Sequence, residues 1–318
     1  MQYKIIYFYL LTIFVTISSC TGKKKEVNEH GIKKENSTSL PCGAIPIYYN
    51  SDSIKLIYFD AIFNDTDNVV IIWDTGANRV TMPNLFINSL NEANRLKLKI
   101  GSNELTYKEE IYFSDVFNQG IIARKRRKNI LFTGWNLFKD KIVEVSYANR
   151  YIRILKNSNN LESYECIPFS IKNNKLFTNI SVSIQNKTFH IKDALIDTGF
   201  NESFISDNRQ LSGIDMKKSR QVPGLASPDK NPFKGNFLLA DRISIGNMHV
   251  DSIMICVTEM GALKFGNWTF TNILGNTFFE NFSVIFDFRN HNLYLKPLNN
   301  WFELYGSHPF YRFAEDKK

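Results

Sequence analysis

The sequence predicts a mainly β protein made of two similar lobes that are related by a pseudo-twofold axis. The tripeptide Asp-Thr-Gly occurs twice, beginning at Asp74 and at Asp197, and each copy ends an apolar run. Other segments also recur in the same order in both halves of the chain. In addition, the chain contains 26 Phe and 14 Tyr, and with many β-branched residues this composition favours strands over helices.

The internal repeat extends well beyond the two tripeptides. Residues 134–154 align without a gap on residues 275–295, and apolar positions coincide along most of this stretch. A third matched element is an Ile-Gly pair that ends at Gly101 in the first half and at Gly246 in the second. Because the order of the elements is the same and only loop lengths differ, we infer that one ancestral lobe was duplicated and fused.

Strands are predicted where apolar and polar residues alternate. Clear examples are residues 97–100, 180–184 and 242–245. In a strand, successive side chains point to opposite faces, so this alternation buries one face and leaves the other exposed. We therefore expect these segments to be half-buried antiparallel strands.

Helix is expected only in short pieces, at residues 85–95, 135–139 and 276–281. The last two follow Gly134 and Gly275, which occupy matching positions in the repeat. In the first half, the apolar pair before the glycine is separated from it by two more residues than in the second half. Each half is therefore expected to carry a short helix after a turn that joins hydrophobic residues to a glycine.

This arrangement resembles the aspartic proteases, and their retropepsin-like branch more than their pepsin-like branch. The resemblance covers residues 47–297 and depends on two Asp-Thr-Gly loops, each followed by an apolar pair, a glycine, a short helix and a strand pair. It implies two acid-protease-like β-barrels, with Asp74 and Asp197 as the catalytic residues. Retroviral enzymes build this site from two chains, whereas this single chain should be active as a monomer.

The chemistry of the family explains these residue types. Two carboxylates held close together share one proton, so that one accepts a proton from water while the other donates to the scissile carbonyl. Gly76 and Gly199 allow a tight turn in which backbone N–H groups reach the carboxylate oxygens. The resemblance further implies that Thr75 and Thr198 hydrogen-bond across the interface. We expect no metal ion and no cofactor.

The residue after each glycine differs between the two loops. It is Ala77 in the first, as in retroviral enzymes, but Phe200 in the second, where family members carry a small residue. A phenyl ring there could desolvate the carboxylates, raise their pKa or block the site. Two functions therefore stay open: an aspartic endopeptidase, or a catalytically inactive module of the same fold that binds extended peptides in its cleft.

A flap that closes over the site is expected in lobe two. Between its Asp-Thr-Gly loop and its Ile-Gly turn, this lobe has many more residues than lobe one, and the extra stretch is rich in Gly, Pro, Ser and Lys. The hypothesis places the flap tip at residues 222–228. The alternatives are a disordered surface insertion, or a lid formed by residues 106–128 of lobe one. The candidate flap residues are Val222, Pro223, Gly224 and Leu225.

The N-terminus resembles that of a bacterial lipoprotein. Residues 1–19 contain an early lysine and a long apolar stretch, and end in small residues directly before Cys20. This pattern fits a signal peptide followed by an acylated cysteine; an uncleaved anchor or a simple signal peptide are the alternatives. We expect a protein of the cell envelope that faces the periplasm, and the residue after Cys20 favours the outer membrane over the inner.

The rest of the chain divides into a tether, two lobes and an extension. Residues 20–45 are polar and rich in lysine, as is typical of a flexible tether. The N-terminal lobe is expected at residues 46–155 and the C-terminal lobe at 166–298, with a linker at 156–165. Residues 299–318 are assigned to a C-terminal extension.

Charge and cysteine content narrow the possible partners. The net charge of +8 lies largely in the tether and in a basic run at residues 124–128, which we interpret as a solvated loop or as a site for anionic lipid headgroups. The run lacks interleaved aromatic residues and the protein should be exported, so we expect no nucleic-acid binding. The expected partners are a peptide or protein substrate and, through Cys20, a membrane. Cys42, Cys166 and Cys256 allow at most one disulfide.

Overall fold

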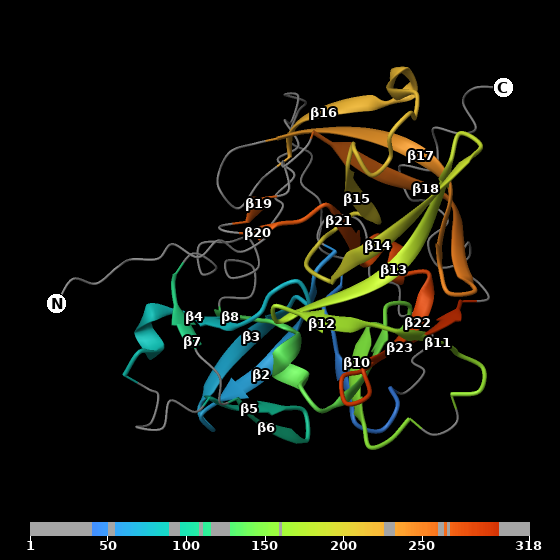
Figure 1. The fold of residues 1–318 in the computed structure, drawn as a ribbon. Helices are drawn as coiled ribbons and strands as arrows, with labels where there is room; N and C mark the ends of the chain where they lie inside the picture. Colours follow the sequence, from blue (N-terminus) through green and yellow to red (C-terminus); the bar gives the residue numbers. More distant parts are fainter. Residues whose placement is uncertain are drawn as a thin grey trace, which may run out of the picture.

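A computed structural model of the chain describes residues 40–49, 55–88, 96–107, 111–115, 128–158, 161–225, 233–259, 264–265 and 268–298. These residues form mainly strands in two lobes, which confirms the predicted fold class (Figure 1). The predicted signal peptide, Cys20 and the predicted extension at 299–318 lie outside the described residues. No helix in the described part is long and apolar enough to cross a membrane.

Lobe one contains a seven-stranded sheet in the order β6-β5-β2-β3-β8-β4-β7. The central strand β3 is antiparallel to β2 and parallel to β8, and it ends directly before Asp74. The first Asp-Thr-Gly loop therefore leaves the sheet from a strand that is held on both sides. The strands are β2 (Ile57–Phe63), β3 (Asp67–Trp73), β4 (Val80–Met82), β5 (Leu96–Ile100), β6 (Asn103–Tyr107), β7 (Ile111–Phe113) and β8 (Asn129–Thr133).

Lobe two contains an eight-stranded sheet in the order β12-β13-β14-β21-β15-β18-β17-β16, and β13 also pairs with β17, so that this sheet closes into a barrel. Strand β14 lies between β13 and β21 and ends at Asp197, whereas β3 ends one residue before Asp74. The strands are β12 (Ser170–Lys172), β13 (Lys175–Ile184), β14 (Lys187–Asp197), β15 (Phe204–Asp207), β16 (Arg220–Leu225), β17 (Phe233–Ile245), β18 (Met248–Thr258) and β21 (Asn272–Gly275). A separate strand pair is formed by β19 (Lys264–Phe265) and β20 (Trp268–Thr269).

A third sheet joins the lobes in the order β1-β10-β9-β22-β23-β11. At its centre β9 and β22 are antiparallel, and Glu144 faces Ile285, the residue with which it aligns in the repeat. A residue that faces its own equivalent lies on the symmetry axis, so the pseudo-twofold axis passes through this pair. The strands are β1 (Ala44–Pro46), β9 (Ile142–Ser146), β10 (Tyr151–Leu155), β11 (Glu165–Pro168), β22 (Phe282–Asp287) and β23 (Asn292–Pro297).

The Ile-Gly pairs of the repeat form the tight turns of two equivalent hairpins. Gly101 connects β5 to β6, and Gly246 connects β17 to β18. Their φ angles are +59° and +56°, values at which a residue with a Cβ atom is strained and glycine is not. The sequence match at these positions therefore reflects a shared backbone requirement.

The predicted strands are confirmed. Residues 97–100 lie in β5, 180–184 in β13 and 242–245 in β17, and all three strands pair with antiparallel neighbours. In β5, buried and exposed residues alternate without exception. Alternation was thus sufficient to identify both the strands and their buried faces.

The short helices also form at the glycines of the repeat. The helical turn η3 (Trp135–Phe138) follows Gly134, and α2 (Asn276–Phe279) follows Gly275. In the first predicted helix, only the turn η1 (Asn84–Phe86) falls among the described residues, since 89–95 lie outside them. A further turn is η4 (Met216–Lys218).

The looser spacing expected before the first glycine is wrong. Thr133 pairs with Trp73 in β3, and Leu274 pairs with Ile196 in β14, so the two halves have the same register at this point. Thr133 takes the place of the hydrophobic Leu274, and its hydroxyl donates a hydrogen bond to the Ile72 carbonyl (3.2 Å). Because this bond satisfies the hydroxyl, a polar residue is tolerated in a buried strand.

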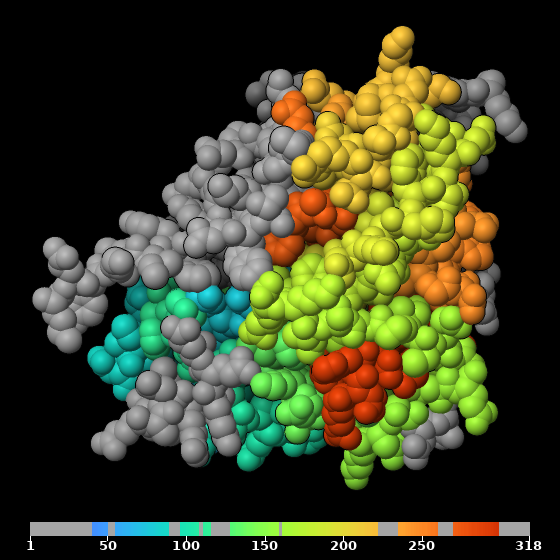
Figure 2. Space-filling view, viewed as in Figure 1, coloured from blue at the N-terminus to red at the C-terminus, as the bar shows by residue number. Residues whose placement is uncertain are grey.

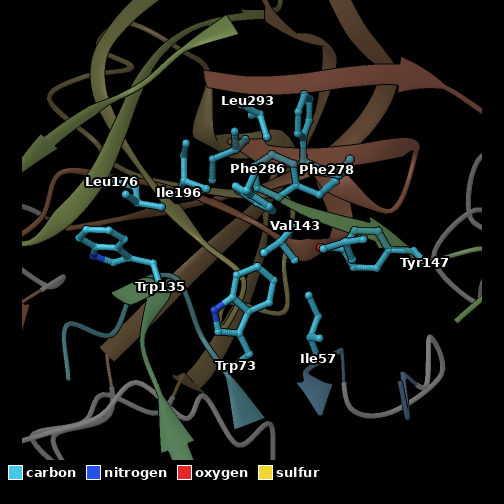
Figure 3. Packing of buried hydrophobic residues seen from close by; sticks show 14 of the residues in the cluster. Ile57, Trp73, Trp135, Val143, Tyr147, Leu176, Ile196, Phe278, Phe286 and Leu293 are labelled. Atoms are coloured by element: carbon cyan, nitrogen blue, oxygen red, sulfur yellow. The ribbon is translucent and has the colours of Figure 1, made fainter. Parts of the chain in front are cut away.

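One continuous hydrophobic core lies behind both Asp-Thr-Gly loops. Trp73 and Ile196, the residues directly before the two aspartates, point into it together with Val143 and Phe286 (Figure 3). The Trp73 ring lies edge-on to Phe286, with ring centroids 5.6 Å apart, and such a pair contributes about 0.5–1.5 kcal/mol beyond its buried area. This core fixes the strand ends from which the two loops emerge.

Late segments of the chain also pack against early ones. Figure 2 shows the turn between β22 and β23 (red) against residues of lobe one (green). There Arg289 donates hydrogen bonds to the carbonyls of Asp140 (2.7 Å) and Lys156 (3.2 Å). Strand β10 ends at Leu155 and strand β11 begins at Glu165, close to the limits of the predicted linker at 156–165. Residues 159–160 of this linker lie outside the described part of the chain.

Candidate active site

The two Asp-Thr-Gly loops meet face to face between the lobes. A Cβ atom on Gly76 would lie 2.4 Å from Cγ of Asp197, and one on Gly199 would lie 2.3 Å from Cγ of Asp74. Any side chain at either glycine would therefore collide with the carboxyl group of the opposite lobe. Both aspartates are 1 % exposed, and their carboxyl groups hydrogen-bond to each other. The structure thus brings together the two carboxyl groups that the sequence identified.

Each carboxylate is also held by its own loop. Oδ1 of Asp74 accepts hydrogen bonds from the backbone N–H groups of Gly76 (2.7 Å) and Ala77 (3.2 Å). Oδ1 of Asp197 accepts one from the N–H of Gly199 (2.8 Å). Bonds from N–H groups to an ionised carboxylate are stronger than neutral ones, so the backbone fixes one oxygen of each aspartate.

The two threonines lock the loops together by reciprocal hydrogen bonds. The N–H of Thr75 donates to Oγ1 of Thr198, and the N–H of Thr198 donates to Oγ1 of Thr75, both at 2.9 Å. The hydroxyls in turn donate to opposite carbonyls, Thr75 to Ile196 (2.9 Å) and Thr198 to Trp73 (3.2 Å). Both threonines are fully buried, so loss of one partner would leave a desolvated polar group.

A second pair of glycines supports the loops from behind. A Cβ atom on Gly134 would lie 2.4 Å from the carbonyl oxygen of Ala77, and one on Gly275 would lie 2.5 Å from that of Phe200. The repeat had identified both glycines by position. Their physical role is to let the Asp-Thr-Gly loop lie directly on the following turn.

Phe200 is a core residue of lobe two. It is 1 % exposed, and its cluster matches the one that surrounds Ala77 in lobe one. The sequence left open whether the ring desolvates or blocks the site, and the structure places it in the packing of its own lobe. The Ala77 cluster contains Leu56, Val70, Ile72, Ile130 and Phe132; the Phe200 cluster contains Leu195, Ile205, Cys256, Phe270 and Ile273.

Asn276, which no sequence motif had marked as a site residue, connects both lobes beneath the second loop. Its side-chain amide donates to the carbonyls of Thr198 and Lys55, and its oxygen accepts from the hydroxyl of Tyr147 (2.8 Å). Asn276 is fully buried, so these bonds satisfy a polar group that would otherwise destabilise the fold. The only signal in the sequence was its position directly after Gly275.

A lysine that no motif had marked also reaches the site. Lys175, the first residue of β13 in lobe two, donates from Nζ to the carbonyl oxygen of Gly76 in lobe one. The carboxylates of Asp74 and Asp197 and the guanidinium of Arg79 act on its charge. The sequence offered no sign of this contact, because a lysine at the start of a strand is most often exposed.

The two carboxyl groups have raised pKa values. Burial raises the pKa of Asp74 well above its ordinary value of 3.8, and the charge of Asp197 and the hydrogen bond between the two groups raise it further. Burial also raises the pKa of Asp197, while its hydrogen bond to Asp74 opposes that rise. Raised pKa values in two adjoining buried carboxyl groups are the pattern of a pair that shares one proton.

The candidate flap residues lie in one arm of a hairpin. Val222 pairs with Gly235 and Leu225 with Phe233, which joins β16 to β17. Residues 226–232, which include the end of the predicted flap tip at 222–228, lie outside the described part of the chain, as does most of the alternative lid at 106–128. The location of a lid therefore stays a prediction.

The three cysteines in the described part of the chain do not pair. Cys42, Cys166 and Cys256 are free thiols.

No family model and no curated protein matches this sequence. Among solved structures, the aspartic proteinase from Irpex lacteus is similar, with a TM-score of 0.50 and 11% identity over 81% of this chain and 97% of that chain. At this identity the likeness establishes the fold of an aspartic proteinase and leaves the activity to be tested.

Proposed function

We propose that this protein is an aspartic endopeptidase that hydrolyses peptide bonds with a water molecule activated by Asp74 and Asp197. The observation that carries the proposal is the pair of buried carboxyl groups, which face each other on loops locked by the bonds between Thr75 and Thr198. The fold likeness to an aspartic proteinase supports the same function.

The proposed mechanism uses the proton that the pair shares. Ionised Asp197 accepts a proton from water while the water oxygen bonds to the scissile carbonyl carbon, and Asp74 donates its proton to the carbonyl oxygen. The C–N bond then breaks as Asp197 returns its proton to the nitrogen and Asp74 regains one from a hydroxyl of the intermediate. The pair ends with one shared proton, as it began. The threonine bonds hold both carboxyl groups in place, so little reorganisation is needed.

The inactive peptide-binding alternative depended on Phe200 and on the looser spacing expected in lobe one, where the two lobes have the same register. Because the Phe200 side chain packs among the apolar residues of lobe two, we retain the enzyme as the proposal. Peptide binding without cleavage becomes one outcome of the test below.

The cellular context is part of the proposal and depends on the sequence. The signal-like segment before Cys20 supports a lipid-anchored protein of the bacterial cell envelope that faces the periplasm, with the outer membrane favoured. Its substrates would be peptides or exported proteins. Since one chain supplies both aspartates, the protein would act as a monomer, and the mechanism requires neither a metal ion nor a cofactor.

The decisive experiment compares cleavage of a mixed peptide library by the wild type, Asp74→Asn and Asp197→Asn from acid to neutral pH. Each variant should lose on the order of 10²- to 10⁴-fold in rate, because it lacks one member of the acid–base pair. The matched control is Asp193→Asn, since Asp193 lies on the same strand with its side chain 51% exposed. Equal cleavage by all four proteins would exclude the mechanism. Binding of peptides by folded wild type without cleavage at any pH would favour the inactive module.

A further inference from the structure

Lys175 places a third ionisable group next to the two carboxyl groups. Its Nζ crosses from lobe two to the lobe-one loop and donates to the carbonyl oxygen of Gly76. A Cβ atom on Gly76 would lie 2.4 Å from Cγ of Asp197, so this loop is in direct contact with the second carboxyl group. On another side, Nζ lies 5.5 Å from the centre of the Phe270 ring, a distance at which a ring face attracts a cation.

The pseudo-twofold axis does not reproduce this contact. Leu56 is the residue of lobe one that corresponds to Lys175, because Tyr58 pairs with Ile72 as Phe177 pairs with Leu195. The neighbouring Lys55 points its Nζ elsewhere and donates to Thr277 (2.8 Å) and Glu280 (2.7 Å). Among the residues that the structure describes, none supplies an ammonium to Gly199 as Lys175 does to Gly76. The ammonium belongs to one side of the site only.

We propose that Lys175 is a positioning residue of this site, whose ammonium holds the lobe-one loop against lobe two and sets how many protons Asp74 and Asp197 carry. The inference rests on the proposed function, because it concerns the protonation state that the hydrolysis requires. With one shared proton the carboxyl pair carries a single negative charge, which the ammonium balances. An ammonium beside the buried carboxyl groups offsets part of the desolvation penalty that an unpaired buried charge would carry.

Three charged groups act on Lys175: the two aspartates attract its ammonium, and Arg79 repels it. Burial lowers the pKa of Lys175, whereas Asp74 and Asp197 raise it and Arg79 lowers it. In return, Lys175 lowers the pKa of both aspartates. The guanidinium of Arg79 stacks on the ring of Tyr112, with its carbon 3.7 Å from the ring centre. Among the described residues, these are the charged groups that act on Lys175.

The test titrates the carboxyl groups directly, in protein labelled with ¹³C at the aspartate carboxyl carbon and followed by NMR. The signals are assigned with Asp74→Asn and Asp197→Asn. In Lys175→Met, both titration steps of the pair should move to higher pH by about one unit or more, because a nearby positive charge has been removed. Lys175→Arg keeps the charge and should titrate close to the wild type. The control Lys172→Met removes an exposed lysine from the same hairpin and should change neither step.

This readout separates the inference from the proposed function. If the protein cleaves no peptide, the function fails, but a titration shift in Lys175→Met that is absent in Lys175→Arg still supports the role of Lys175. If it cleaves peptides, both limbs of the pH profile of kcat/KM should move to higher pH in Lys175→Met. Unchanged titration in folded Lys175→Met, or equal shifts in the Met and Arg variants, would overturn the inference. If Lys175→Met does not fold, Lys175→Gln replaces it in the same comparison.

Discussion

The two Asp-Thr-Gly loops share one backbone design and differ in the side chains around them. In both loops the glycine N–H donates to its own aspartate, and the threonine bonds to its counterpart in the other lobe. Within the described part of the chain, an ammonium group, that of Lys175, reaches only the loop of lobe one. The loop of lobe two is instead followed by a large side chain, Phe200. The comparison teaches that the symmetric contacts bring the carboxyl groups together, while the asymmetric ones make their surroundings unequal.

The polar contacts that join the lobes also differ between the two sides of the interface. In one half, the Nζ of Lys55 and the hydroxyl of Tyr49 both donate to Glu280, at 2.7 and 2.8 Å, within the protein interior. In the other half, Trp135 donates from its indole nitrogen to the Asn174 carbonyl (2.9 Å). A buried ion pair thus supports one side of the interface and a neutral hydrogen bond supports the other.

The largest effect on stability should come from truncation of Phe200, the large side chain that only the lobe-two loop carries. Phe200→Ala should lower the free energy of unfolding by about 3–5 kcal/mol, because it leaves a cavity in the lobe-two cluster. Urea unfolding measures this loss, and Leu239→Ala is the control, since Leu239 is 52% exposed. If the ring acts only in packing, the pH profile of hydrolysis should stay unchanged. A small loss of stability together with a shifted profile would instead place the ring's effect at the carboxyl groups.

The symmetric threonines should give a smaller effect of equal size in the two lobes. Thr75→Val and Thr198→Val each leave a buried N–H of the opposite loop without its acceptor, at a loss of about 1–3 kcal/mol. The double variant should lose less than the sum, because both substitutions remove bonds of one network. The exposed Thr188 provides the control, as Thr188→Val. Clearly unequal losses from the two single variants would show that the lobes do not share this network evenly.

The smallest predicted effect is the change in the free energy of unfolding with each pH unit. The pKa of Asp74 lies well above 3.8 in the folded protein, so the unfolded chain releases this proton at lower pH than the folded chain does. The free energy of unfolding should therefore fall as the pH rises from about 4 through the raised pKa, by up to about 1.4 kcal/mol per pH unit. Asp74→Asn should flatten this dependence in urea unfolding across that range, whereas Asp193→Asn should leave it intact. The same slope in both variants would contradict the raised pKa.

The sequence predicted those strands, turns and site residues whose structure is set by adjacent residues or by the internal repeat. Alternation located β5, β13 and β17, and the glycines marked turns where a Cβ atom would be strained or would collide. Matching contexts paired Asp74 with Asp197. These predictions succeeded because strand periodicity and close backbone approach impose requirements on residue type that are visible along the chain.

Other features had no local signal. Thr133 lies where the other lobe has Leu274, so the polar residue interrupts the apolar pattern and the sequence predicts a wrong spacing there. The correct register follows only from the pairing of Thr133 with Trp73. The burial of Phe200 likewise depended on the space available in its cluster, which residues from several strands define.

The duplicated β fold and the pairing of Asp74 with Asp197 could be predicted from the amino-acid sequence, because the same short motif occurs twice among elements that recur in the same order. Only the tertiary structure decided that Lys175 would reach Gly76, from a position 99 residues away, and that Asn276 would join three segments under the second loop. Long side chains act at their tips, and the position of a tip depends on how distant strands pack rather than on adjacent residues. The electrostatic balance of the site is therefore a property of the folded chain.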